Sequence, residues 1–244
     1  MAVVDHWIWM LVCPILAYFI GAIPFSYLIA KWRSGIDIRQ TGNKNVGGLN
    51  VMMRSGFIWG FLSGMLDFLK GLVCLIIVLY VPFNDNPLAG LGKYYEITQH
   101  QLIYMFVAIA VILGHNFPIF LKFHGGRGVA AISGFLLLTN PLLFTAFIIT
   151  TGLVTVITGY IRPAQVVAMF VGVPIAFFLN FFPPWIVNQG LNSTFFLGMF
   201  TLGISLTILP KYIKPIIDAF KGTEYQMGKK GVDFKEEDTS DSNN

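Results

Sequence analysis

Long apolar segments almost without charge are the feature that most restricts what this chain can fold into. Six of them reach the roughly 17–25 residues that an α-helix needs to cross a bilayer, and they lie at residues 7–31, 57–82, 101–121, 141–159, 163–182 and 193–210. Only 11% of the residues are charged, against about 25% in soluble domains, so a water-facing surface could not be covered. The sequence therefore predicts an all-α polytopic membrane protein, with residues 1–210 as a single transmembrane domain.

A shorter apolar piece at residues 129–139 raises the question of a seventh crossing. If it crosses and the N-terminus lies outside, all but two of the 16 Lys and Arg residues fall on the cytoplasmic side, the exceptions being Lys70 and Lys93. Cytoplasmic connections are normally enriched in these residues, whereas a six-span arrangement would place Arg162 and the basic tail outside. We therefore expect seven transmembrane helices, an outside N-terminus and a cytoplasmic C-terminus. Residues 211–244 are expected to form a basic cytoplasmic tail with a disordered end.

A glycine-rich loop precedes the short apolar piece, in the sequence "GHNFPIFLKFHGGRGVA". Gly125, Gly126 and Gly128 surround Arg127 where a helix is expected to begin. Free N–H groups at a helix N-terminus and an adjacent guanidinium together favour a bound phosphate. The loop is not a Walker A motif, because the spacing and the Lys-Ser/Thr pair are absent. The alternative interpretation is that the glycines only permit a tight reversal between spans.

The connection at residues 34–56 is a second polar feature on the same predicted membrane face. It is rich in Gly and Asn, and Asn45, Gly47, Asn50 and Arg54 offer backbone and side-chain donors. Successive N–H groups in such turns can form a concavity that binds anions. The two polar loops together indicate a site for a phosphate-bearing ligand at the cytosolic membrane surface.

Charged and titratable residues also occur inside or at the ends of the predicted spans. Asp67 and Lys70 lie three residues apart, on one face of a helix, and intramembrane charges usually mark function; a structural ion pair is the alternative. His115 ends the third span, where it is either a hydrogen-bonding residue of the helix end or a base. The four scattered His residues and the lack of a carboxylate cluster predict no metal site. The net charge of +4 follows from the membrane topology and does not indicate nucleic-acid binding.

These motifs resemble those of the acyl-phosphate:glycerol-3-phosphate acyltransferases, seven-span membrane enzymes that begin bacterial phospholipid synthesis. The resemblance runs from residue 19 to residue 213 and includes "FIGAIPFSYLIAKWRSGIDIR", "LDFLKG" and the glycine-rich loop. Arg127 stands where the family usually has Lys. Asn43 and Leu49 replace the usual Ser and Thr of the first cytoplasmic motif, and Lys211 and Lys214 stand near the place of a usual Arg-His pair.

The resemblance implies transfer of a fatty acyl group from acyl phosphate to the 1-hydroxyl of glycerol 3-phosphate, without a cofactor, giving lysophosphatidic acid and phosphate. It implies catalytic roles for His115, Asp67 and Lys70. The implied substrate- and phosphate-binding residues are Asn45, Gly47, Asn50, Arg54, Gly125, Gly126, Arg127 and Gly128. The expected partners are these two substrates and membrane lipid, at the cell membrane with the site on the cytoplasmic face; the oligomeric state stays open.

Two other functions remain open at this point. The altered first motif also fits a related membrane transferase with a different phosphorylated acceptor or lipid donor. A non-enzymatic carrier or lipid-binding protein on the same scaffold is less favoured, because no inverted repeat is apparent and the outside connections carry no matching polar site.

Overall fold

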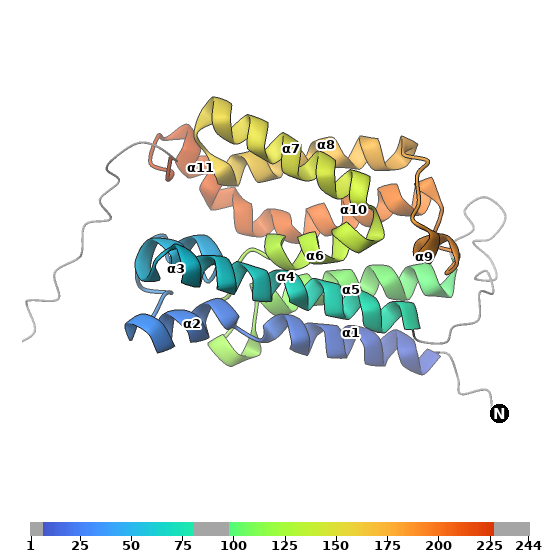
Figure 1. Cartoon of the computed structure of the whole chain (residues 1–244), viewed down its shortest axis with the longest axis horizontal. Helices are drawn as coiled ribbons and strands as arrows, with labels where there is room; N and C mark the ends of the chain where they lie inside the picture. Colours follow the sequence, from blue (N-terminus) through green and yellow to red (C-terminus); the bar gives the residue numbers. More distant parts are fainter. Residues whose placement is uncertain (1–6, 81–97, 227–244) are drawn as a thin grey trace, which may run out of the picture.

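A computed structural model describes residues 7–80 and 98–226, and these residues form an all-helical bundle (Figure 1). Six helical segments are long and apolar enough to cross a membrane, namely Ile8–Ser34, Phe57–Tyr80, Gln99–Leu121, Pro141–Thr158, Ile161–Phe178 and Thr194–Phe220. Within them lie the helices α1 (Trp7–Ala22), α2 (Phe25–Ser34), α4 (Phe57–Tyr80), α5 (Gln99–Asn116), η1 (Ile119–Leu121), α7 (Pro141–Thr158), α8 (Ile161–Phe178), α10 (Thr194–Ile208), η2 (Leu209–Tyr212) and α11 (Ile213–Phe220). The multi-pass helical architecture predicted from the sequence is thus confirmed.

The helices form two groups with α6 (Val129–Thr139) between them. Helices α1, α4 and α5 make one group, and α7, α8 and α10 make the other (Figure 1). The core where α5, α6 and α10 meet is aromatic, with the rings of Tyr104, Phe135 and Phe200 in mutual contact. The start of α1 and the end of α11 lie at opposite ends of the bundle (Figure 1).

Helix α6 has 11 residues, which at 1.5 Å per residue give about 16 Å, roughly half of a bilayer's hydrocarbon core. It lies against α4 at backbone distance, because a Cβ added to Gly71 would overlap the Ala131 carbonyl and one added to Gly134 would overlap that of Phe68. Small residues of this kind allow helices to approach closely in membranes, where dispersion contacts and not water exclusion hold helices together.

The turn from α6 to α7 is buried, and its polar groups form hydrogen bonds with the connection at residues 179–193. The Asn140 side chain is fully buried, accepts from the Leu143 N–H at 3.0 Å and donates to the Phe181 carbonyl at 2.7 Å. The Trp185 indole donates to the Leu138 carbonyl at 2.8 Å. Because an unpaired backbone group in apolar surroundings costs several kcal/mol, these bonds explain how so short a helix can end inside the bundle.

Four further elements differ from the expectations. The first span is broken at Pro24, which has no N–H to continue the helix and disfavours helical backbone at the residue before it. The first polar connection contains a helix, α3 (Gly48–Ser55), and the connection after α8 contains the short α9 (Pro184–Val187). Residues 211–226, assigned from the sequence to a tail, pack onto the bundle and bury Tyr212 and Glu224. The predicted disordered end lies outside the described residues.

Candidate active site

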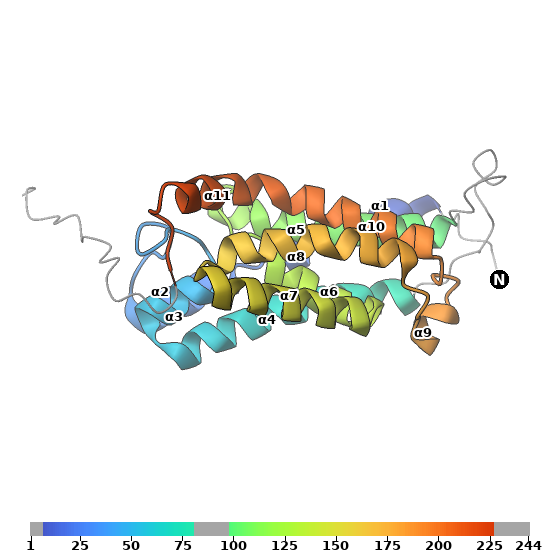
Figure 2. The ribbon, with the colours of Figure 1, turned by 90° about the horizontal axis from the view of Figure 1, so that it is seen from above.

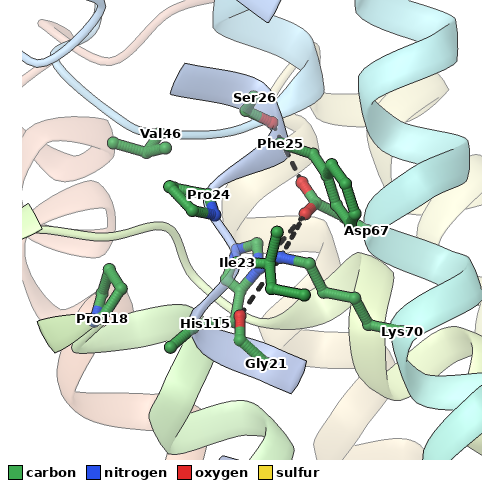
Figure 3. A pocket seen from close by; sticks show the side chains of 11 residues that line it. Gly21, Ile23, Pro24, Phe25, Ser26, Val46, Asp67, Lys70, His115 and Pro118 are labelled. Atoms are coloured by element: carbon green, nitrogen blue, oxygen red, sulfur yellow. Dashed lines mark hydrogen bonds and ion pairs between the residues drawn. The ribbon is translucent and has the colours of Figure 1, made fainter. Parts of the chain in front are cut away.

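A buried group of charges joins α4 to the break in the first span (Figure 3). The Asp67 carboxylate lies 2.8 Å from the Lys70 ammonium, and each side chain is only 2% exposed. The other carboxylate oxygen of Asp67 accepts from the Ser26 hydroxyl at 2.9 Å, at the start of α2. Nδ1 of His115 lies 3.6 Å from Asp67 Oδ1, so three elements meet at this carboxylate.

The geometry of Lys70 explains why a lysine is kept inside the bundle. Its ammonium donates to the Gly21 carbonyl at 3.1 Å and lies 5.2 Å from the centre of the Phe25 ring. Gly21 belongs to the last turn of α1, whose final carbonyls have no partner within the helix and attract cations. Lys70 therefore closes the end of α1 while Asp67 binds the beginning of α2. The pair stabilises the break that Pro24 makes, as the structural interpretation of these two charges predicts.

The glycine-rich loop lies directly on His115. The Gly126 N–H donates to the His115 carbonyl at 3.0 Å, and a Cβ on Gly126 would overlap both the His115 imidazole at Nε2 and the Val46 carbonyl. Gly128 has φ = 82° and is the N-cap of α6 without a side-chain capping bond. The loop thus needs glycine at 126 for contact and at 128 for conformation, and it brings Arg127 to the N-terminus of α6.

The loop that precedes α3 is held together from inside by Asn50. Its side chain is fully buried, and its Nδ2 lies 3.0–3.1 Å from the carbonyls of Ile38, Thr41 and Asn45. Its Oδ1 accepts from the Asn43 N–H at 3.3 Å. Asn50 is predicted to contact substrate, and in this structure its amide is engaged by the backbone of the loop.

A large pocket opens between α3 and α4 on one side and α6, α7 and α8 on the other, with a volume of about 640 Å³. Its polar lining residues include Asn45, Asp67, His115, Arg127, Arg162, Gln165 and Tyr212. Its apolar lining residues include Phe57, Phe61, Met65, Phe68, Phe147 and Ile148. A pocket lined by both cationic and apolar side chains fits an amphiphile that has an anionic head and an acyl chain.

Arg127 is the pocket cation without a fixed partner. Among residues 7–80 and 98–226 its guanidinium has no carboxylate or hydrogen-bond partner, and it lies 5.8 Å from the centre of the Tyr212 ring. Burial, and next the neighbouring Arg162, lower the pKa of Arg127 to about 10. At neutral pH Arg127 remains charged, so a desolvated positive charge faces the pocket and an anion would stabilise it.

The sequence over residues 11–222 matches the family described as glycerol-3-phosphate acyltransferase. The chain belongs to this family. It is 37% identical over 166 residues to the glycerol-3-phosphate acyltransferase of Pseudothermotoga lettingae, covering 68% of this chain and 75% of the relative. It is 31% identical to that of Acholeplasma laidlawii over 92% of this chain and 96% of the relative.

A solved structure agrees with the family membership. The fold is similar to the crystal structure of PlsY (YgiH), an integral membrane glycerol 3-phosphate acyltransferase, in its glycerol 3-phosphate form. The TM-score is 0.69 at 26% sequence identity, and the match covers 90% of this chain and 96% of that chain. The resemblance inferred from the sequence motifs is therefore confirmed at the level of family and fold.

The structure divides the residues expected at this acyltransferase site into two sets. Those that line the large pocket are Asn45, Gly47, Asp67, His115, Arg127 and Gly128. Those that do not line it are Asn50, Arg54, Lys70, Gly125 and Gly126. Lys70 instead borders a small cavity of about 10 Å³ that shares Asp67 and His115 with the large pocket. Lys70, predicted to be catalytic, contacts Asp67, which lines both cavities.

Three pocket residues, Arg162, Gln165 and Tyr212, were not expected at the site. Arg162 was used in the sequence only as a marker of topology, yet Arg162 and Gln165 lie three residues apart and therefore on one face of α8. The Tyr212 hydroxyl donates to Gln165 Oε1 at 2.6 Å, which ties η2 to α8. The polar spacing in "RPAQ" was the signal available; nothing in the sequence indicated Tyr212.

Proposed function

We propose that this protein transfers a fatty acyl group from an acyl phosphate to the 1-hydroxyl of glycerol 3-phosphate. The observation that carries the proposal is the pocket itself, which joins an arginine and glycine loop to an apolar wall in a chain of this family. Both substrates bear a phosphate and the donor also bears an acyl chain. The same pocket therefore offers surfaces complementary to both phosphates and to the acyl chain.

The reaction does not require a covalent bond between the protein and a substrate. The hydroxyl oxygen of the acceptor bonds to the acyl carbon, the bond from that carbon to the phosphate oxygen breaks, and inorganic phosphate leaves with the electron pair. Since an acyl phosphate is already activated, holding two anions close together and neutralising the leaving phosphate provide much of the rate. We assign Arg127 and the N–H groups at the start of α6 to one phosphate, and Asn45 with the Gly47 backbone to the second phosphate or to the glycerol.

Asp67 and His115 both line the pocket. We assign them an orienting role, because Asp67 holds Lys70 and Ser26 while the His115 imidazole packs against Gly126 of the glycine-rich loop. The hydroxyl proton passes to a phosphate oxygen of the substrates themselves. Under this assignment His115→Gln lowers kcat without shifting the pH profile, whereas a shifted acidic limb would identify His115 as the base.

The proposal also includes the number and direction of the membrane crossings. We propose seven crossings, with α6 as the short one, an outside N-terminus, and the pocket on the cytoplasmic face of the cell membrane. The direction of the chain reverses from α5 to α6 and again from α6 to α7 (Figure 1), and the Lys and Arg distribution supports the orientation. A reporter fused after Gly159, between α7 and α8, is expected in the cytoplasm, and an outside signal would refute this topology.

The deciding experiment is release of inorganic phosphate from palmitoyl phosphate by the purified protein, with and without glycerol 3-phosphate. Release that depends on the acceptor, together with lysophosphatidic acid as product, is expected. Arg127→Ala should lower kcat/KM by roughly tenfold to a hundredfold, the value of a lost charge-assisted hydrogen bond, and Arg127→Lys should retain more activity. Folded protein that releases no phosphate with this acceptor but does so with another phosphorylated alcohol would favour the related transferase with an altered acceptor.

A further inference from the structure

A buried carboxylate from the C-terminal segment pairs with a pocket arginine, and neither residue was expected at the site. Glu224 follows α11 and is 3% exposed, and it forms an ion pair with Arg162 in the first turn of α8. Both side chains are desolvated, with exposures of 9% for Arg162 and 1% for Glu224. Buried carboxylates seldom occur without such a partner, because the cost of desolvating a lone charge is several kcal/mol.

The turn that carries Glu224 is built to fold back onto the bundle. Gly222 has φ = 69°, and the N–H groups of Thr223 and Glu224 both donate to the Asp218 carbonyl, at 2.9 and 3.1 Å. The segment then descends from α11 toward the adjoining ends of α7 and α8 (Figure 2). There the Gln226 side chain contacts Gly159, since a Cβ on Gly159 would lie 3.6 Å from Gln226 Cγ.

Arg162 faces both the large pocket and the Glu224 carboxylate. It lines the large pocket together with Arg127 and Tyr212, whereas Glu224 does not line that pocket. Burial raises the pKa of Glu224, and Arg162 and then Arg127 oppose this rise. The buried Arg162 and the half-buried Arg127 with a single carboxylate leave one net positive charge among these three residues, and Glu224 holds Arg162 while the pocket is empty.

We infer that Glu224 is an internal counter-anion of the phosphate site, which a substrate phosphate replaces on Arg162 when it binds. This inference rests on the proposed function, because it assumes that the anionic ligand of the pocket is a phosphate. A phosphate group can carry two negative charges and accept two hydrogen bonds from a guanidinium fork, so it competes with one carboxylate for the same donors. Displacement of Glu224 frees the turn at residues 221–226 from α8. Glu224 thereby sets how strongly the site holds phosphate.

The test is binding of inorganic phosphate and of glycerol 3-phosphate to the full-length protein in detergent, measured by calorimetry for the wild type and for Glu224→Gln. Loss of the competing carboxylate should tighten binding by about tenfold, or ~1.4 kcal/mol. Asp218→Asn is the matched control, because Asp218 lies in the neighbouring helix α11 and its side chain forms no ion pair with Arg162, and it should change the Kd less than about twofold on the same scale. Unchanged or weaker binding by Glu224→Gln would overturn the inference and make Glu224 a residue that merely holds Arg162 in place.

A second measurement uses the wild type alone, so it does not depend on the folding of a variant. Hydrogen exchange of the amides at residues 221–226 should accelerate when inorganic phosphate saturates the site, and unchanged or slower exchange would contradict displacement. The proposed function fails separately, if no acyl transfer occurs. Tighter phosphate binding by Glu224→Gln without any acyl transfer would leave this inference standing, whereas acyl transfer with unchanged binding would remove the inference alone.

Discussion

Two groups of buried charges lie at the polar side of this bundle, and they differ in how their charges are balanced. Asp67 and Lys70 neutralise one another, and the Lys70 ammonium, which only donates, faces Asp67, the Gly21 carbonyl and the Phe25 ring. Arg127, Arg162 and Glu224 carry two positive charges against one negative charge. The first group is complete without a ligand, whereas the second leaves a guanidinium facing the pocket.

The difference shows why a charge in a membrane segment needs its partners identified before a function is assigned. Burying an ion pair costs desolvation free energy, which the attraction and hydrogen bonds between the two charges offset. If one of the two residues is removed, the other stays buried without this compensation. An unbalanced cation is stable only where a solvent-filled pocket or a ligand compensates it. On this reasoning Lys70 is a residue of the scaffold and Arg127 a residue of the site.

The largest effect is expected when one charge of the Asp67–Lys70 ion pair is removed. Lys70→Met leaves Asp67 buried without its cation and should lower the free energy of unfolding by about 3–5 kcal/mol, seen as a lower midpoint of thermal unfolding in detergent. The double variant Asp67→Asn with Lys70→Met removes both charges and should recover most of this loss. A Lys70→Met protein as stable as the wild type but without activity would show instead that Lys70 touches substrate.

An intermediate effect is expected from the contact between the glycine-rich loop and His115. Gly126→Ala adds a Cβ that overlaps the His115 imidazole and the Val46 carbonyl, so the loop must move and take Arg127 with it. We expect kcat/KM to fall by at least about tenfold, or ~1.4 kcal/mol, in initial rates of phosphate release. Gly152→Ala is the matched control, since a Cβ there meets nothing within 4 Å and should leave the rate unchanged. Equal rates for all three proteins would mean that the loop does not position Arg127.

The smallest effect is expected from Arg127→Ala when stability and not activity is measured. Arg127 has no ionic partner among the described residues, so its removal should change the free energy of unfolding by no more than about 0.5 kcal/mol. Thermal unfolding of this variant beside Lys70→Met gives the comparison directly. A loss as large as that of Lys70→Met would remove the distinction between scaffold and site charges drawn above.

Features that depend on neighbouring residues in the chain could be predicted well from the sequence. The apolar runs identified the spanning helices to within a few residues, and Gly125 to Gly128 indicated a helix N-terminus that the structure places at Val129. The sequence did not indicate contacts that depend on partners distant in the chain. Asn50 reads as an exposed donor in a Gly- and Asn-rich loop, yet three carbonyls of that loop converge on its amide. No local pattern reports that convergence.

The sequence by itself determined the membrane class, the family and the position of the cationic loop, because hydropathy, charge and short motifs are local properties of the chain. Only the tertiary structure decided which polar residues share a pocket. It turned Lys70 toward the end of α1, placed Tyr212 beside Arg127, and brought Glu224 back to Arg162 across 62 positions of the chain. The physical reason is that a buried charge selects its partner by distance in space, and the folding of η2 and α11 onto α8 sets those distances.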